Sequence, residues 1–119
     1  MVEVNITVTE DNLVTLFSDA DSGAAWWARI RYKFPAYVKG CCYEEKLVDF
    51  VMNHGGTFII EDVEEETEYI IHKMTVVGAL QLMSEKHPDD FFNLLSGNDD
   101  ATTGDIFFQL LCFREVIYG

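Results

Sequence analysis

Carboxylates are the most abundant side chains here that could do chemistry. The chain has 21 acidic residues against 8 Lys and Arg, a formal net charge of −13. Six of them fall within one eight-residue stretch: Glu61, Asp62, Glu64, Glu65, Glu66 and Glu68. A second acidic pair is Asp99 and Asp100. Such a run is commonly a solvated turn. The alternative is a negative projection that docks into the basic cleft of a partner protein.

A smaller cluster combines aromatic and basic side chains. Trp26 is followed by Arg29 and Arg31. Such cations often lie over aromatic surface with their heads in water. The alternative is a ledge on which a base stacks while the arginines hold a phosphate. Trp27 continues an apolar stripe and is predicted to be buried, whereas Trp26 is predicted to lie nearer the surface.

No catalytic or metal-binding signature is evident. The three cysteines show no C-x-x-C spacing, and the three histidines are scattered along the chain. Phosphate-loop, dinucleotide-binding and nucleophile-elbow motifs are lacking. An acidic environment also raises a thiol pKa and so opposes cysteine nucleophilicity. The sequence therefore predicts a protein without enzymatic activity, metal or cofactor. A metal site or a cysteine nucleophile would need Cys41 or Cys42 to meet one of the histidines, His54, His72 or His87, and no spacing supports that.

Composition predicts a single globular domain over residues 1–119 in the cytoplasm. The negative field disfavours direct binding to nucleic acid or to an acidic membrane surface. No apolar stretch approaches the length of a membrane span, and the first residues lack the basic start of a signal peptide. The cysteine pattern does not resemble a secreted disulfide framework.

The first half of the chain predicts a strand and two helices. Alternation over residues 2–8 indicates a half-buried strand. Thr9 is predicted to cap a helix whose buried stripe contains Leu13, Leu16, Phe17, Ala20, Ala24 and Trp27. Gly23 within that pattern indicates either a kink or a close approach by another element. For residues 28–42, helix and strand remain competing predictions. A second helix over 43–53 is predicted to stop at His54-Gly55-Gly56.

The second half predicts a hairpin and three helices. Apolar runs flanking the acidic turn indicate a β-hairpin over residues 57–74. Thr75 is predicted to cap a helix that Pro88 ends, with Gly78 indicating close packing, and a short helix then closes at Gly97. Residues 98–103 are predicted to form a polar loop.

The last predicted helix is the most apolar part of the chain. From Ile106 to Phe113, Gln109 is the single polar residue. A helix that is apolar all round is central in its domain or buried in an interface, so we expect a core helix, with a homodimer interface as the alternative. The final residues EVIYG are predicted to add a short strand. The predicted class is α+β, with a central hairpin and an N-terminal strand packed against four to five helices.

Three segments carry a family resemblance. They are ITVTEDNLVTLFSDADSGAAWW, GGTFIIEDVEEETEYIIHKMTVVGAL and DATTGDIFFQLLCFREVIYG. Together they resemble a family of small acidic proteins from bacteriophages and other mobile elements of Gram-positive bacteria. The resemblance implies a mobile-element accessory protein in a bacterial host cell, and it implies no functional residue. Before the terminal EVIYG it leads us to expect a small residue such as glycine, where this chain has Arg114.

Charge and resemblance together predict an inhibitor. The leading hypothesis is a DNA-mimic-like protein that binds a nucleic-acid-handling defence protein of the host, of the anti-CRISPR or anti-restriction type. One alternative is a sponge that sequesters a nucleotide immune signal at the Trp26 ledge. Another is a structural module that assembles through the apolar C-terminal helix.

Overall fold

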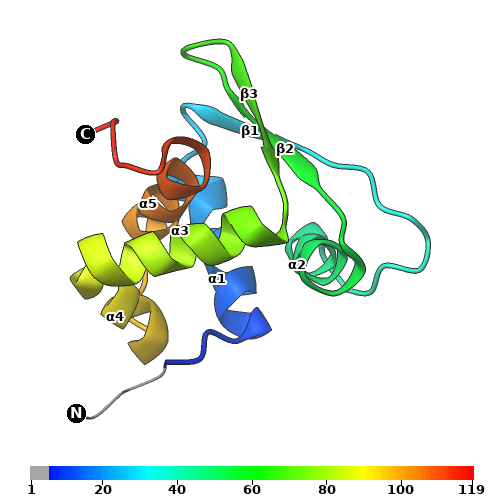
Figure 1. Ribbon diagram of the computed structural model, residues 1–119, viewed down its shortest axis with the longest axis horizontal. Coiled ribbons are helices and arrows are strands. Elements are labelled where there is room, and N and C mark those ends of the chain that lie inside the picture. The colour runs from blue at the N-terminus through cyan, green and yellow to red at the C-terminus, as the bar shows by residue number, and fades with distance from the viewer. Residues whose placement is uncertain (1–5) are drawn as a thin grey trace.

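A computed structural model describes residues 6–119 and gives an α+β fold, as predicted (Figure 1). In the described part of the chain, five helices accompany a three-stranded antiparallel sheet. The elements in order are α1 (Glu10–Gly23), β1 (Ala28–Arg31), α2 (Tyr43–His54), β2 (Phe58–Asp62), β3 (Thr67–Ile71), α3 (Lys73–Lys86), α4 (Pro88–Ser96) and α5 (Ala101–Phe113).

Helix α1 begins at the predicted cap. The Thr9 hydroxyl accepts a hydrogen bond from the Asn12 amide at 3.1 Å, and the Asn12 side chain accepts one from the Thr9 amide at 3.0 Å. This reciprocal arrangement satisfies two backbone donors that a helix start leaves without partners. The helix ends at Gly23, so Trp27 lies beyond it; its ring is nevertheless fully buried, and its indole donates to Asp105 at 2.7 Å.

The sheet is a meander with β2 in the centre. β1 pairs with β2 from Ala28 opposite Asp62 to Arg31 opposite Ile59, and β2 pairs with β3 from Phe58 opposite Ile71 to Asp62 opposite Thr67. Because side chains alternate along a strand, the sheet has two different faces. The inner face joins the core and includes Phe58, Ile60, Asp62 and Ile71, all buried. The outer face comprises Arg29, Arg31, Ile59, Glu61, Glu68 and Ile70.

The third strand is β1 rather than the predicted N-terminal strand. Residues 2–5 of that prediction lie outside the described residues, and Ile6, Thr7 and Val8 are not in a strand. In β1 the apolar side chains of Ala28 and Ile30 alternate with exposed arginines, a pattern too short to decide between helix and strand without its partner β2.

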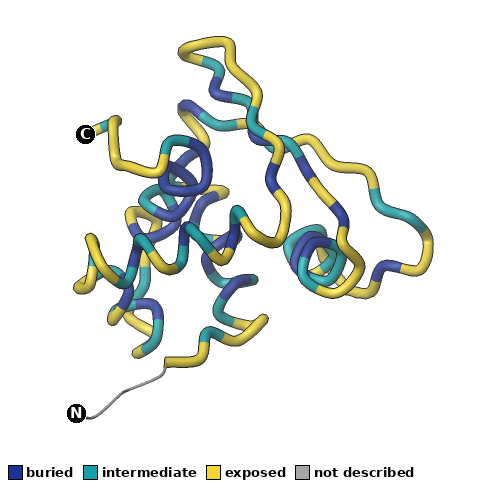
Figure 2. Tube along the Cα trace, in the orientation of Figure 1, coloured by how far each residue is buried: buried dark blue, intermediate teal, exposed yellow. Residues whose placement is uncertain are grey.

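Helix α5 is the core helix, as predicted. It packs against α1 and α3, and Figure 2 shows it as the most continuously buried helix, with Phe107, Phe108, Leu110 and Leu111 all buried. Phe107 and Phe108 make edge contacts with Phe17 of α1 at centroid distances of 5.6 and 5.8 Å. The apolar surface of α5 is therefore covered within one chain by α1 and α3.

Two glycines allow α1 and α5 to meet backbone to backbone. A Cβ added to Gly104 would lie 2.2 Å from the backbone nitrogen of Ala20, and one added to Gly23 would lie 1.8 Å from the carbonyl oxygen of Ala101. Of the two roles predicted for Gly23, a kink or a close approach by another element, the structure shows the close approach. The close packing predicted at Gly78 is wrong, because a Cβ there would meet only the Arg114 guanidinium, at 3.8 Å.

Two predicted helix starts change, and one predicted strand does not form. Helix α3 begins at Lys73, and Thr75 acts from inside it, where its hydroxyl accepts from the His72 amide at 3.3 Å. Helix α5 begins at Ala101 within the predicted loop, because Asp100 caps it by accepting from the Thr103 amide at 3.1 Å. The final segment, residues 114–119, forms no strand. The stops at Gly55 and Gly97 are confirmed, both with left-handed backbone.

Replacing Gly104 by alanine tests the helix contact. We expect Gly104→Ala to lower the free energy of unfolding by about 1–3 kcal/mol, because the added methyl forces α1 and α5 apart. Gly78→Ala is the matched control in another helix: it has room, and it is expected to stabilise by up to about 1 kcal/mol. Urea unfolding of the three proteins measures both changes. Equal effects of the two substitutions would contradict the close-contact explanation.

Arg114 tests the end of α5. This residue has φ +61° as the helix C-cap, a left-handed conformation that favours glycine. We expect Arg114→Gly to raise the free energy of unfolding by about 1 kcal/mol, since glycine removes the clash of Cβ with the backbone. Arg114→Ala keeps a Cβ and should show no such gain. If alanine stabilised as much as glycine, the arginine side chain would be the cause instead of the backbone.

Candidate partner-binding surface

The β2–β3 hairpin ends in three consecutive glutamates. We call Glu64, Glu65 and Glu66 the hairpin tip. Asp62 shapes the turn: one of its oxygens accepts from the amides of Glu64 at 3.0 Å and Glu65 at 3.3 Å. Thr67 closes the other side by donating its hydroxyl to the Glu65 carbonyl at 3.1 Å. Glu66 has φ +54°, so the turn uses a left-handed residue that is not glycine.

The hairpin tip is exposed and extends past the helices. All three glutamates are exposed, and Figure 2 shows the turn as a continuous yellow loop. In Figure 1 the same turn lies farther from the helices than the rest of the sheet. Three like charges on a short turn repel one another, and the Asp62 hydrogen bonds hold the backbone in place against that repulsion.

Asp62 does not belong to the exposed acidic surface predicted from the sequence. Its side chain is fully buried, and its second oxygen accepts from the Tyr118 hydroxyl at 2.7 Å. This hydrogen bond, together with burial, raises the pKa of Tyr118. The sequence groups Asp62 with five other carboxylates, but its place on the inner face of β2 makes it a structural residue.

The C-terminal segment is held by Gln109. Its side-chain oxygen accepts from the amides of Ile117 and Tyr118, both at 2.8 Å, and its nitrogen donates to the Tyr118 carbonyl at 3.3 Å. The Tyr118 ring also packs on Trp26 and Trp27. The sequence marks Gln109 as the polar exception in α5 but does not indicate this role; a buried amide in an apolar helix is a signal that it bonds to a nearby backbone segment.

Glu61 and Glu68 lie on the outer face of the sheet among the two arginines. Arg31 forms an ion pair with Glu68, and both side chains are about half exposed. Arg29 stands directly opposite Glu61 in the β1–β2 register. Oppositely charged neighbours across a sheet attract, so this part of the surface carries little net charge. The uncompensated negative charge of the hairpin is therefore concentrated at its tip.

Asp99 and Asp100 belong to a separate region. They precede α5, whereas the hairpin lies at the other end of that helix, where Phe113 packs against Tyr69. At about 1.5 Å per residue, the 13-residue helix separates the two ends by about 20 Å. Asp100 is occupied in capping α5. Burial raises the pKa of nearby Asp19 to about 7, and the neighbouring carboxyls of Asp99 and Asp100 add to the shift.

The Trp26 ledge is not supported as a nucleotide site. Trp26 is 54% exposed, as predicted, and its ring contacts Tyr118 at a centroid distance of 5.0 Å. Arg29 and Arg31 point to the outer face, where carboxylates are their neighbours. A phosphate would have to displace Glu68 to bind Arg31.

The cysteines and histidines are not brought together. Cys41 and Cys42 are exposed, while Cys112 is buried, and burial raises the pKa of its thiol to about 12. Within residues 6–119, no three side chains of His, Cys, Asp or Glu are grouped so that they could hold a metal ion.

Comparisons with known proteins do not assign the chain to a family, so the resemblance to mobile-element proteins stays a prediction. The chain matches no protein-family model, no curated protein and no solved structure. None of the helices in the described part of the chain has the length and apolar character needed to cross a membrane.

The Tyr118 hydroxyl tests the anchoring of the hairpin. We expect Tyr118→Phe to lower the free energy of unfolding by about 1–3 kcal/mol, because the buried Asp62 oxygen loses its hydrogen-bond donor. Tyr37→Phe, at a tyrosine that is 59% exposed, is the matched control and should change stability by less than about 0.5 kcal/mol. Thermal or urea unfolding gives both values. A Tyr118→Phe protein as stable as the control would show that the Asp62 contact contributes nothing.

Proposed function

We propose that the protein acts without catalysis, by docking its hairpin tip into a basic cleft of another protein. The observation that carries this proposal is the exposed, fixed trio of Glu64, Glu65 and Glu66 at the end of a projecting hairpin. A positively charged cleft would gain Coulomb energy from all three carboxylates, and the ordered turn would lose little conformational freedom on binding.

The surrounding surface favours a protein partner over a nucleic acid or a membrane. The net charge of −13 repels phosphates, while it accelerates encounter with a basic protein at low ionic strength. Ile70, on the outer face toward the end of β3 away from the tip, is 65% exposed beside the Arg31–Glu68 pair, and it offers an apolar contact to a partner that extends along the sheet. Binding through the tip would therefore combine salt-dependent steering with a small apolar contact.

The proposed target is a nucleic-acid-handling defence protein of a bacterial host. Its nucleic-acid channel is basic by necessity, so carboxylates held on a protein surface compete for it with phosphates. The resemblance to mobile-element proteins supports a target of this class, because such elements gain from blocking defence. Asp99 and Asp100, at the other end of α5, would be a second contact only for a partner that spans the molecule.

Neutralising the tip tests this function. We expect Glu64→Gln, Glu65→Gln and Glu66→Gln combined to weaken partner binding at least tenfold, because close charge pairs at such interfaces contribute about 1.5 kcal/mol or more each. Wild-type and variant proteins are immobilised, host lysate is passed over them, and bound proteins are eluted along a salt gradient and identified. A purified candidate is then assayed for nucleic-acid binding with and without the protein.

The control replaces three acidic residues elsewhere, Asp11→Asn, Glu85→Gln and Asp89→Asn, which changes the net charge equally. Asp62 is left intact because its substitution would disturb the turn. The proposal predicts that the captured protein binds DNA or RNA, that DNA competes with its capture, and that only the tip variant loses it. Equal loss of capture in both variants, or a captured protein that neither binds DNA nor is displaced by it, would refute the role of the tip.

A further inference from the structure

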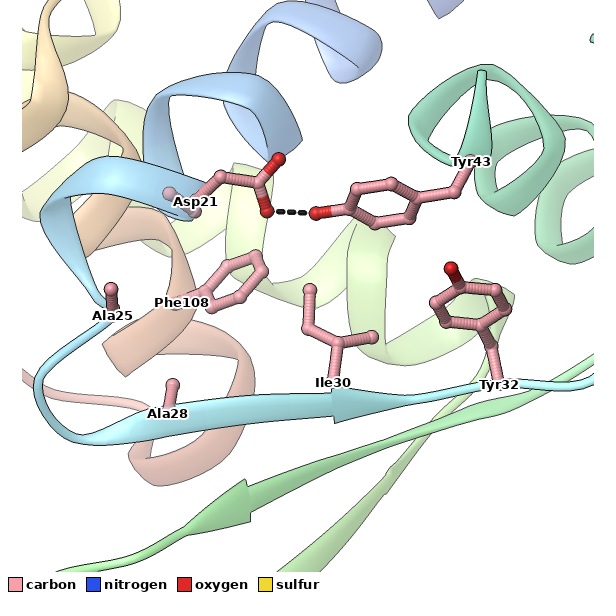
Figure 3. A pocket seen from close by; sticks show the side chains of 8 residues that line it. Asp21, Ala25, Ala28, Ile30, Tyr32, Tyr43 and Phe108 are labelled. Carbon is pink, nitrogen blue, oxygen red and sulfur yellow. Dashed lines mark hydrogen bonds between the residues drawn. The ribbon is translucent and has the colours of Figure 1, made fainter. Parts of the chain in front are cut away.

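A cavity of about 220 Å³ lies between the end of α1, strand β1 and the start of α2. Figure 3 shows its lining side chains converging from these three elements and from α5. We call it the Asp21 pocket, and its lining residues are Ala20, Asp21, Ala25, Ala28, Ile30, Tyr32, Tyr43 and Phe108. It lies on the inner face of β1, and the arginines of that strand point to the opposite face.

The pocket has an apolar floor and a polar rim. Ala28, Ile30 and Phe108 form the floor in Figure 3, and the Tyr43 hydroxyl donates a hydrogen bond to Asp21 above them. The Tyr32 ring stacks on Tyr43 at 5.3 Å with an interplanar angle of 5°, which fixes the wall on that side. A ligand that fits must therefore present an apolar part to the floor and a polar group to Asp21.

The rim carries negative charge without a compensating cation. Asp21 has Glu44 as its neighbour, and desolvation together with this second carboxyl raises the pKa of Asp21 to about 7. Among residues 6–119, the ion pairs within 4 Å are Arg31 with Glu68 and His54 with Asp49, so neither Asp21 nor Glu44 has a basic partner. A carboxyl that lines an apolar cavity, has a second carboxyl as its neighbour and lacks a basic partner in the described part of the chain favours a positively charged ligand.

We propose that the Asp21 pocket binds an alkylammonium or alkylguanidinium group, with the alkyl chain on Ala28, Ile30 and Phe108 and the cationic head at Asp21. The positive charge of the ligand would compensate the negative charge at the rim, which has no basic partner among the described residues. The alkyl chain of the ligand would cover the apolar floor. This site is separate from the hairpin tip, and its occupation does not depend on the proposed function.

Other ligand classes fit less well. An anion would meet Asp21 and Glu44, and an uncharged alkyl chain would leave their repulsion in place. A metal ion needs several oxygen ligands around it, and the floor offers only alkyl and phenyl groups. The shared chemistry of a free amine and of a lysine or arginine side chain matches both the charge and the floor.

The full chain is titrated at pH 7.5 with n-butylammonium, n-butylguanidinium and n-butanol, followed by amide chemical shifts. We expect both cations to shift the amides of Ala25, Ala28 and Ile30 saturably, with millimolar dissociation constants as befits so small a ligand. The neutral alcohol should bind at least tenfold more weakly. Saturation by n-butanol at the same concentration, or no saturable shift with either cation, would overturn the proposal.

Two substitutions locate the site. Asp21→Asn keeps the acceptor for Tyr43 but removes the charge, and it should weaken n-butylammonium binding about tenfold. Asp11→Asn, at the other end of α1, should change it less than twofold. Ala25→Leu, at an exposed lining residue, should narrow the pocket and weaken binding while both carboxyls remain. Equal effects of Asp21→Asn and Asp11→Asn would show attraction to overall charge and overturn the site.

The source of the cation is then distinguished with 1,5-diaminopentane and a capped peptide, acetyl-Gly-Ser-Lys-Ser-Gly-amide. Tighter binding of the diamine would support a free small-molecule amine, and tighter binding of the peptide would support a basic side chain of a partner protein. Failure of both to shift the pocket amides would overturn the proposal.

Discussion

The backbone contact between α1 and α5 is the constraint on which the rest of the structure depends. Gly104 and Gly23 bring the two helices so close that no side chain fits between them at either position. With the axes fixed there, Phe17 reaches Phe58 of β2 as well as Phe107 and Phe108 of α5. This pair of helices thus fixes the position of the sheet and, with it, the positions of the side chains on the sheet surface.

The hairpin depends on a second, polar set of contacts. Asp62, Tyr118 and Gln109 form a partly buried chain of hydrogen bonds that links the turn after β2, the C-terminal segment and the core helix. Buried polar groups are costly unless paired, so this network specifies one arrangement of the three segments. The exposed carboxylates of the hairpin tip are thus held in place by the buried carboxyl of Asp62.

Sequence patterns predicted where helices and turns lie better than they predicted which elements pair or pack with one another. The Thr9 cap, the glycine stops, the buried Trp27 and the central α5 all followed from local periodicity and capping chemistry. The strand β1 did not, because four residues carry too little pattern and its identity depends on pairing with β2. Similarly, the inward direction of Asp62 depends on register, and one residue of offset would have exposed it. The Asp21 pocket joins residues from α1, β1, α2 and α5, an assembly that spacing along the chain does not indicate.

The anchoring of the hairpin by Tyr118 also has a consequence for the order in which the chain becomes structured during synthesis. Asp62 and Tyr118 are 56 residues apart, and Trp27 and Asp105 are 78 apart. A ribosome releases the hairpin long before it releases either distant partner, so the turn leaves the exit tunnel with its buried carboxyl still in water. Contacts this remote in sequence slow folding. The local turn can form early, but its anchoring to the core through Asp62 should follow only after Tyr118 has left the ribosome.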